Sequence, residues 1–231
     1  GSAQILPYEQ RQAPISPESL LPFDVTEAKV REDMRKWYGS RWFAPNRLKK
    51  GAMTDTAKGV YIPYWTFDAQ SHADWTAQSG YYYYVSESYR DSEGKSRTRR
   101  VRKIRWRNSN GDLDHFFDDL LVSGTKGVEP ELLGKVEPFP TDQLVAYDPG
   151  FVSGWLVEHY QIDLIAAAQQ SQNRMNQNLT KLCAGQVPGD THRFLKVDSR
   201  FWDQTFKHIL VPIWLLSYRY GKNSYQVIVN G

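Results

Sequence analysis

Residues from Gly59 onward show a period of two in their apolar and polar positions, which is typical of β-strands. Four segments carry this pattern, each rich in aromatic and β-branched residues and followed by turn-forming residues: YIPYWTFDA (61–69), GYYYYVSES (80–88), RTRRVRKIRW (97–106) and LDHFFDDLLV (113–122). They predict an antiparallel meander. Two further strands, at 206–220 and 223–231, are predicted to pair as a hairpin across Gly221, Lys222 and Asn223.

Two other segments show the period of an amphipathic helix. A short N-terminal helix is predicted over about 25–38, where Asp24 and Glu27 resemble a capping box. A long amphipathic helix is predicted over about 162–184 and is expected to end at Gly185. Its apolar stripe is formed by Ile165, Ala168, Met175, Leu179 and Leu182.

These elements predict an α+β fold in which antiparallel β-sheets carry the two helices packed on them. Residues 1–22 contain four prolines and little periodicity, so we expect an irregular N-terminal arm that begins with the tag-like residues Gly1 and Ser2. We expect residues 23–231 to form a single α+β domain, because neither group of strands is large enough to close a core alone.

Composition excludes several classes of protein. The longest apolar run, 209–216, is much shorter than the ~20 residues that a membrane-spanning helix needs. Cys183 is the only cysteine, which excludes an internal disulfide and a cysteine-based zinc site within this chain and suits a reducing compartment. The net charge of +3 implies an anionic partner only if the charge is concentrated in one place.

The positive charge is concentrated in one predicted strand, near the tyrosines at 81–84. Cations beside aromatic rings are typical of surfaces that bind single-stranded nucleic acid, so these residues are candidates for a polyanion-binding site. Alternatively, a turn at Asn110-Gly111 would lay the strand against Asp112, Asp114, Asp118 and Asp119, and the charges would neutralise one another. Both readings stay open for the candidate residues Arg97, Arg99, Arg100, Arg102, Lys103, Arg105, Arg107 and Trp106.

No catalytic, cofactor-binding or metal-binding residue is predicted, and we expect the chain not to be an enzyme. Gly94-Lys95-Ser96 resembles the end of a phosphate-binding loop, but Tyr89 stands where that motif needs glycine, so a polar hairpin turn is predicted instead. The aspartates near His115 match no calcium-loop spacing. The remaining histidines form no metal-binding pair; they are His72, His159, His192 and His208.

Several segments resemble a bacterial family of zinc-ribbon proteins that are labelled primosomal protein N′ or superfamily II helicase-like. These segments are RWFAPNRLKKGA (41–52), GVYIPYWTFDA (59–69), FFDDLLVSG (116–124) and FKHILVPIWLLSYRYGKNSYQVIVNG (206–231). The resemblance implies that this chain is the family's central soluble domain. It implies that zinc is bound only by an N-terminal four-cysteine ribbon missing here, and that the full protein continues past Gly231. Some members of the family continue into membrane-anchoring segments.

The first functional hypothesis is a non-catalytic interaction domain of a membrane-associated bacterial zinc-ribbon protein, with an unidentified protein partner. The resemblance implies a cytoplasmic location, tethered to the inner membrane through segments outside this chain. The alternative hypothesis is a nucleic-acid-binding accessory domain linked to replication or repair, with weak binding to nucleic acid. The helicase label has no support in these residues, because a complete phosphate-binding loop is needed for an ATP motor.

Overall fold

The computed structural model describes residues 14–40, 57–220 and 223–231, and side chains at all of these except 37–40, 217–220 and 223–226. The resemblance segment at 41–52 therefore lies outside the described residues. The described chain forms two compact units. Unit 1 contains the described parts of Gly1–Trp65, Ser123–Asp163 and Lys207–Gly231, and unit 2 contains Thr66–Val122 and Leu164–Phe206. The single domain predicted over 23–231 stays a prediction.

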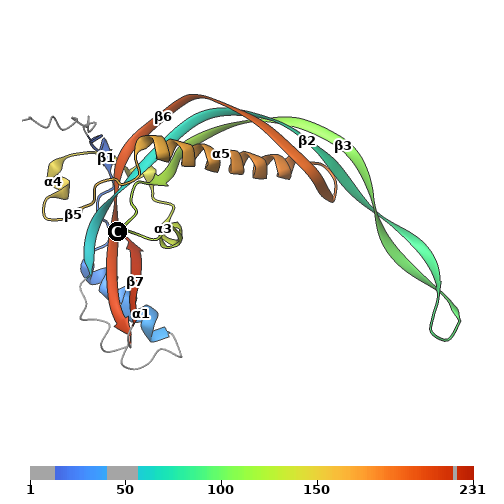
Figure 1. Cartoon of the computed structure of the whole chain (residues 1–231). Helices are drawn as coiled ribbons and strands as arrows, with labels where there is room; N and C mark the ends of the chain where they lie inside the picture. The colour runs from blue at the N-terminus through green and yellow to red at the C-terminus, as the bar shows by residue number, and fades with distance from the viewer. Residues whose placement is uncertain (1–13, 41–56, 221–222) are drawn as a thin grey trace, which may run out of the picture. The chain divides into compact units, whose positions relative to one another are not determined.

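Helices and a large β-sheet together make up the fold, as predicted (Figure 1). The sheet has the strand order β3-β2-β6-β1-β4, with β5 beside β2 and β7 beside β6. The strands of the described chain are β1 (Ser19–Leu20), β2 (Lys58–Arg90), β3 (Ser96–Ser123), β4 (Val145–Ala146), β5 (Leu156–Val157), β6 (Thr191–Tyr220) and β7 (Asn223–Asn230). The helices are α1 (Glu27–Ser40), α3 (Pro130–Val136), α4 (Pro149–Val152) and α5 (Leu164–Gln186), with a 3₁₀ turn at Thr141–Gln143.

The predicted pairing of the last two strands is confirmed, because β6 and β7 are antiparallel from Ile213↔Asn230 to Tyr220↔Asn223. A purely antiparallel sheet is wrong, because β1 pairs with β6 and β5 pairs with β2 in parallel. Residues 19–20, predicted to belong to the irregular arm, form β1 between β6 and β4. Leu20 is fully buried there against Tyr61 and Leu210, so burial explains why this part of the arm is ordered.

The predicted four-stranded meander is wrong, because two long strands replace it. β2 continues through the turn expected near residues 70–79, and β3 continues through Asn110-Gly111. Gly111 lies in the strand for a packing reason: a Cβ atom there would come within 2.6 Å of the Trp75 side chain. Gly80 has the matching role in β2, where a Cβ atom would come within 2.8 Å of Trp106. Both glycines therefore make room for a tryptophan on the neighbouring strand.

Unit 1 has an aromatic core. Trp65 is completely buried and donates its indole N–H to the carbonyl of Ile162 at 2.9 Å. Its ring packs against Tyr160 and against His208, whose pKa is lowered by burial. A second aromatic group forms where Phe23 stacks on Trp155, with ring centroids 4.1 Å apart.

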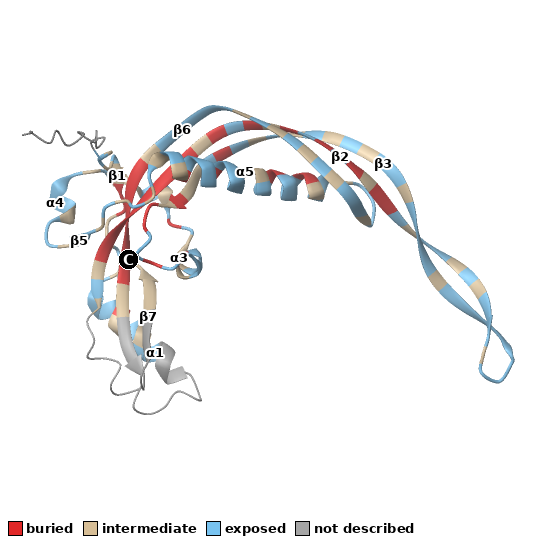
Figure 2. Cartoon of the chain, viewed as in Figure 1, coloured by how far each residue is buried: buried red, intermediate tan, exposed pale blue. Residues whose placement is uncertain are grey.

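Unit 2 is built on α5 and one face of the long strands (Figure 1). Burial alternates along β2, and its buried residues include Ala69, Ala73, Trp75 and Ala77 (Figure 2). The buried positions of α5 recur at every fourth residue: Ala167, Ser171, Met175, Leu179 and Cys183. Four residues turn a helix slightly more than once, so this stripe winds around α5.

Three members of the stripe predicted for this helix are wrong. Met175 and Leu179 are buried, whereas Ile165 is 71% exposed, Leu182 is 41% exposed and Ala168 is exposed. The small residues Ala167 and Ser171 occupy buried positions instead. The contact face of the helix combines small with large side chains, and apolarity alone did not identify it.

The packing of α5 can be tested by substituting one predicted stripe member that is buried and one that is exposed. We expect Met175→Ala to lower the free energy of unfolding by about 2–5 kcal/mol, because it leaves a cavity. Ile165→Ala should change it by less than about 0.5 kcal/mol. Denaturant unfolding measures both values, and equal losses would contradict the burial pattern.

The Gly111–Trp75 contact predicts that Gly111→Ala lowers stability by about 1–3 kcal/mol, because the added methyl group overlaps the indole ring. Gly185→Ala in α5 is the matched control, since nothing lies within 4 Å of its added Cβ atom. That control should be neutral or up to about 1 kcal/mol more stable. Thermal unfolding compares the two variants, and a neutral Gly111→Ala would contradict the contact.

Candidate functional site

The predicted basic residues lie on the part of the β2–β3 hairpin that extends past the start of β6. The Asp190 N–H donates to the carbonyl of Gly80 at 2.9 Å, and β6 begins at the next residue. From Gly80 onward, β2 and β3 continue as a two-stranded arm, which we call the ribbon (residues 80–107; Figure 1). The ribbon contains nine basic and three acidic residues, so it is strongly cationic although the whole chain has a net charge of only +3.

The tip of the ribbon is a hairpin turn, which confirms the interpretation of Gly94-Lys95-Ser96. Gly94 adopts a φ of 78° and donates its N–H to the carbonyl of Asp91 at 2.9 Å. The Asp91 carboxylate accepts the backbone N–H groups of Glu93 and Lys95 at 3.0 and 2.9 Å. Two of the amides that a bound phosphate would use are therefore already hydrogen-bonded to a side chain of the protein.

The glycine–tryptophan contacts define which residues of the ribbon lie opposite one another. Trp75 lies against Gly111, and Trp106 lies against Gly80. A step of five residues forward along β2, from 75 to 80, therefore corresponds to a step of five residues back along β3, from 111 to 106. Successive side chains of a strand point to opposite faces. The ribbon therefore has an odd face, with odd-numbered residues of both strands, and an even face, with even-numbered residues.

The odd face is partly neutralised by its own carboxylates. Glu87 pairs with Lys103 at 2.9 Å and with Arg99 at 3.5 Å. The hydrogen bond to Lys103 lowers the pKa of Glu87, and the same contact raises the pKa of Lys103. At the tip, Arg97 donates to Asp91 at 2.6 Å, and this bond lowers the pKa of Asp91.

The even face carries cations stacked on aromatic rings. Arg100 lies over Tyr84 and Arg102 over Tyr82, each with 4.3 Å between the guanidinium carbon and the ring centroid. Arg193 of β6 lies 4.1 Å over Trp106 in the same way. Even-numbered positions of the ribbon contain no acidic residue. No ion pair among the described residues involves Arg100, Arg102 or Arg193.

The predicted neutralisation by the strand after Asn110-Gly111 is wrong. Because β3 does not turn there, its aspartates lie farther along the same strand and cannot face the basic residues. The partner of the basic segment is the tyrosine-rich end of β2, which brings only Glu87 and Asp91. Arg105 and Arg107 on the odd face likewise lie over Tyr83 and Tyr81, with longer distances of 5.5 and 5.8 Å.

Sequence reasoning missed Arg193, which β6 places beside the even face, and Arg90, an even-face residue of the ribbon itself. Arg193 follows the ribbon by more than 80 residues, and no local pattern around it indicates binding. Its position depends on β6 pairing beside β2, where its Nε–H also donates to Gln78 at 2.8 Å. Only the tertiary structure brings it to Trp106.

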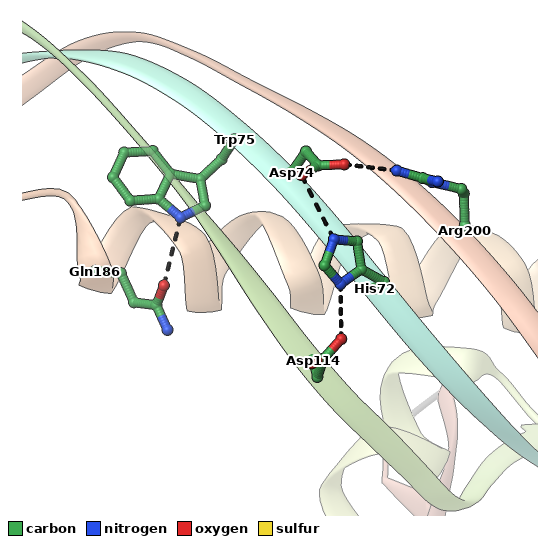
Figure 3. A network of polar contacts seen from close by, with 6 residues as sticks. All are labelled: His72, Asp74, Trp75, Asp114, Gln186 and Arg200. Carbon is green, nitrogen blue, oxygen red and sulfur yellow. Dashed lines mark hydrogen bonds and ion pairs between the residues drawn. The ribbon is translucent and has the colours of Figure 1, made fainter.

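Asp114 of β3 belongs to a polar network within unit 2. Asp114 lies 2.7 Å from Nδ1 of His72, and Asp74 lies 3.4 Å from Nε2 (Figure 3). Arg200 of β6 donates to Asp74 at 2.7 Å, so one network joins three strands. Figure 3 shows Trp75 apart from this network, with its indole N–H donating to Gln186 of α5 at 3.3 Å.

Asp68, Asp118 and Asp119 have carboxylate oxygens within 4.8 Å of one another. Alternation predicts Asp118 and Asp119 on opposite faces of the strand. The left-handed backbone of Asp119, with φ of 48°, interrupts that alternation. Asp68 accepts the Asp119 N–H at 2.8 Å and the Thr205 hydroxyl at 2.9 Å. Through these two hydrogen bonds, Asp68 of β2 links its strand to β3 and to β6.

A cavity of about 680 Å³ lies in unit 1, lined partly by Phe23, Trp155 and Trp214. Phe23 stacks on Trp155, and Trp214 meets both rings edge-on. Trp214 also donates its indole N–H to the carbonyl of Val25 at 2.8 Å. The rings are thus held by one another and by the backbone, and the cavity does not indicate a class of ligand.

Comparison with known proteins adds one relative. No protein-family model and no solved structure matches the chain. The chain is 20% identical over 225 residues to the uncharacterized protein YdjG of Bacillus subtilis (strain 168), which covers 94% of this chain and 61% of the relative. The resemblance to zinc-ribbon proteins stays a prediction. No helix among the described residues is long and apolar enough to cross a membrane.

The His72 network predicts a pH-dependent contribution to stability. Hydrogen bonding to Asp114, aided by Asp74, raises the pKa of His72 above its usual value of about 6.5. The folded state therefore holds the proton more tightly than the unfolded state, so the stabilisation is complete below about pH 6.5 and disappears as the pH rises through the folded-state pKa.

We expect His72→Gln to lower the melting temperature most near pH 5.5 and least near pH 8. Asp114→Asn should reduce the same pH dependence, and the double variant should resemble His72→Gln alone because both changes remove one interaction. Thermal unfolding across this pH range measures the effect. A difference that grows as the pH rises would contradict the network.

Proposed function

We propose that this chain is a non-catalytic binding module and that its partner docks on the ribbon. The observation that carries the proposal is the ribbon's excess of positive charge on a two-stranded arm that contributes little to either core. Its exposed aromatic residues include Tyr81, Tyr83, Tyr84 and Tyr89. Exposed tyrosine and arginine together are typical of binding surfaces, because both are enriched at binding hot spots.

The stacked geometry supports this role. A guanidinium held over a ring keeps its N–H groups at its edge, where they remain able to donate to an anion. An exposed cation–π contact contributes only about 0.5–1 kcal/mol, which is little for a structural purpose. Concentrated positive charge also attracts anionic partners and speeds their association. The ribbon is therefore suited to an acidic partner.

We propose that α5 acts as an amphipathic brace for the strands from which the ribbon extends. Its buried residues pack on the sheet, and Trp75 of β2 donates to Gln186 at the end of the helix nearest the ribbon. Arg174 donates to the carbonyl of Leu121 at 2.6 Å, which joins α5 to β3 as well. A braced base would hold the ribbon in one direction and reduce the entropy lost on binding.

Site-specific photo-crosslinking in cells tests the proposal without assuming a partner. A crosslinking amino acid at Ser88 on the ribbon should give defined adducts, because this exposed position lies beside the basic residues. The same amino acid at the exposed Gln172 of α5 is the matched control and should give none. Adducts at Gln172 but not at Ser88 would overturn the ribbon as the docking surface.

A shortened ribbon provides the second control. Replacing residues 84–102 by Asn-Gly joins Tyr83 to Lys103 through a two-residue turn that favours a hairpin. We expect this variant to keep its melting temperature within a few degrees, because the deleted side chains are mostly exposed. Loss of cooperative unfolding would show that the ribbon is structural and would contradict the proposal.

A further inference from the structure

We infer that the even face of the ribbon binds single-stranded nucleic acid, with Arg100, Arg102 and Arg193 as the phosphate-binding and base-stacking residues. This inference rests on the proposed function of the ribbon as the docking surface. It selects one face of that ribbon and one class of partner. The selection comes from how the cations of the two faces are paired.

The two faces differ in how their cations are engaged. On the odd face, the three carboxylates engage four of the six cations, namely Lys95, Arg97, Arg99 and Lys103, whereas Arg105 and Arg107 lie over Tyr83 and Tyr81. On the even face, Arg100 and Arg102 lie over tyrosine rings, and neither forms an ion pair with another described residue. The nearby Asp190 carboxylate accepts the backbone N–H of Tyr82 at 2.7 Å and forms no ion pair with another described residue. A polyanion therefore displaces no ion pair when it binds the even face.

The three stacked arginines present two kinds of contact to a nucleic acid. Each guanidinium lies over Tyr84, Tyr82 or Trp106, and all three arginines are exposed; Arg193 also lies 5.0 Å over the ring of Phe194. Unpaired bases stack on guanidinium planes and aromatic rings. The N–H fork at the edge of the same group matches phosphate oxygens. One side chain can thus hold a base and a neighbouring phosphate.

The spacing along the ribbon suits a single strand. Two residues of a β-strand advance about 6.6 Å, which separates Arg100 from Arg102. Two stacked nucleotides of one strand advance about 6.8 Å, so successive arginines meet every second nucleotide. From position 100 to position 106 the face is about 20 Å long, or roughly six nucleotides. This falls in the range of known single-strand binding surfaces.

The even face is less suited to two other anionic partners. A membrane surface would favour a continuous apolar stripe for insertion, whereas the even face alternates arginine with tyrosine and serine and exposes Ile104 as its aliphatic residue. A DNA duplex keeps its bases stacked inside, so the exposed guanidinium planes would have no base to contact. Single-stranded nucleic acid uses both features of the face.

Fluorescence anisotropy with labelled dT20 tests the inference on the whole chain. We expect micromolar binding at about 50 mM salt, in the range of sequence-independent contacts. The double variant Arg100→Gln/Arg102→Gln should weaken binding at least tenfold. It should also reduce the slope of log K against log salt by about 1.4, because two phosphate contacts are lost at about 0.7 each. The matched variant Arg97→Gln/Arg99→Gln removes equal charge from the odd face and should weaken binding less than threefold.

Stacking is tested separately from charge. Tyr84→Phe keeps the ring beneath Arg100 and should bind dT20 like the unmodified protein, whereas Tyr84→Ala should lose several-fold. Arg100→Lys/Arg102→Lys keeps the charge but removes the planar group, and should lie between the unmodified protein and the glutamine variant. All these positions are on the surface, so melting temperatures should stay within a few degrees.

Three results would overturn the inference: no dT20 binding at about 50 mM salt, equal losses in the even-face and odd-face variants, or stronger binding to a 20-base-pair duplex, to polyglutamate or to phosphatidylglycerol vesicles than to dT20. Any of these combined with ribbon crosslinks at Ser88 would leave the docking surface in place and change only the partner. Absence of both dT20 binding and Ser88 crosslinks would overturn the proposed function together with the inference.

Discussion

The register between β2 and β3 decides the position of every charged side chain on the ribbon. A shift of one residue would move each side chain to the opposite face, because strand side chains alternate. Two glycine–tryptophan contacts oppose such a shift: the rings of Trp75 and Trp106 lie where Gly111 and Gly80 leave space for them. In a shifted register each ring would meet a side chain instead. Packing near the ribbon's base thus determines the chemistry farther out.

Three residues with positive φ interrupt the alternation elsewhere in unit 2. They are Asp119 on β3 and Phe194 and Asp203 on β6. Asp203 lies between Arg200, which meets Asp74, and Thr205, which meets Asp68. A residue with positive φ between them allows an even-numbered and an odd-numbered side chain of β6 to reach the same side of β2. Phe194 likewise interrupts the alternation of side chains directly after Arg193, which lies over Trp106.

Along the β2–β3 hairpin, most acidic residues lie in the inner part and most basic residues lie in the ribbon, so these two groups do not face each other across the strands. Near the body of unit 2, the aspartates of β2 and β3 contact His72, Arg200 and Thr205. Beyond Gly80, basic residues face tyrosines, and the three acidic residues there pair with four of the nine basic ones. The outer part of the hairpin is therefore cationic, whereas Asp68, Asp74 and Asp114 in its inner part have polar partners.

The sequence by itself determined that the chain combines helices with a large sheet, that the last two strands pair with each other, and that Gly94 lies in a turn. These features follow from local periodicity and turn chemistry, which each segment carries on its own. The sequence also identified the basic residues of the candidate site, because their density is visible without a fold. Arg193 escaped detection, since it is isolated in the chain.

Only the tertiary structure decided which residues face one another. Asn110-Gly111 is a strong turn signal in isolation, yet the packing of Trp75 against Gly111 keeps β3 extended there. The contact face of α5 runs through Ala167 and Ser171 because small side chains let the helix approach the sheet, whereas apolarity had favoured Ile165. Pairing between distant segments depends on packing that no local pattern encodes, and that pairing decided which arginines meet carboxylates and which meet rings.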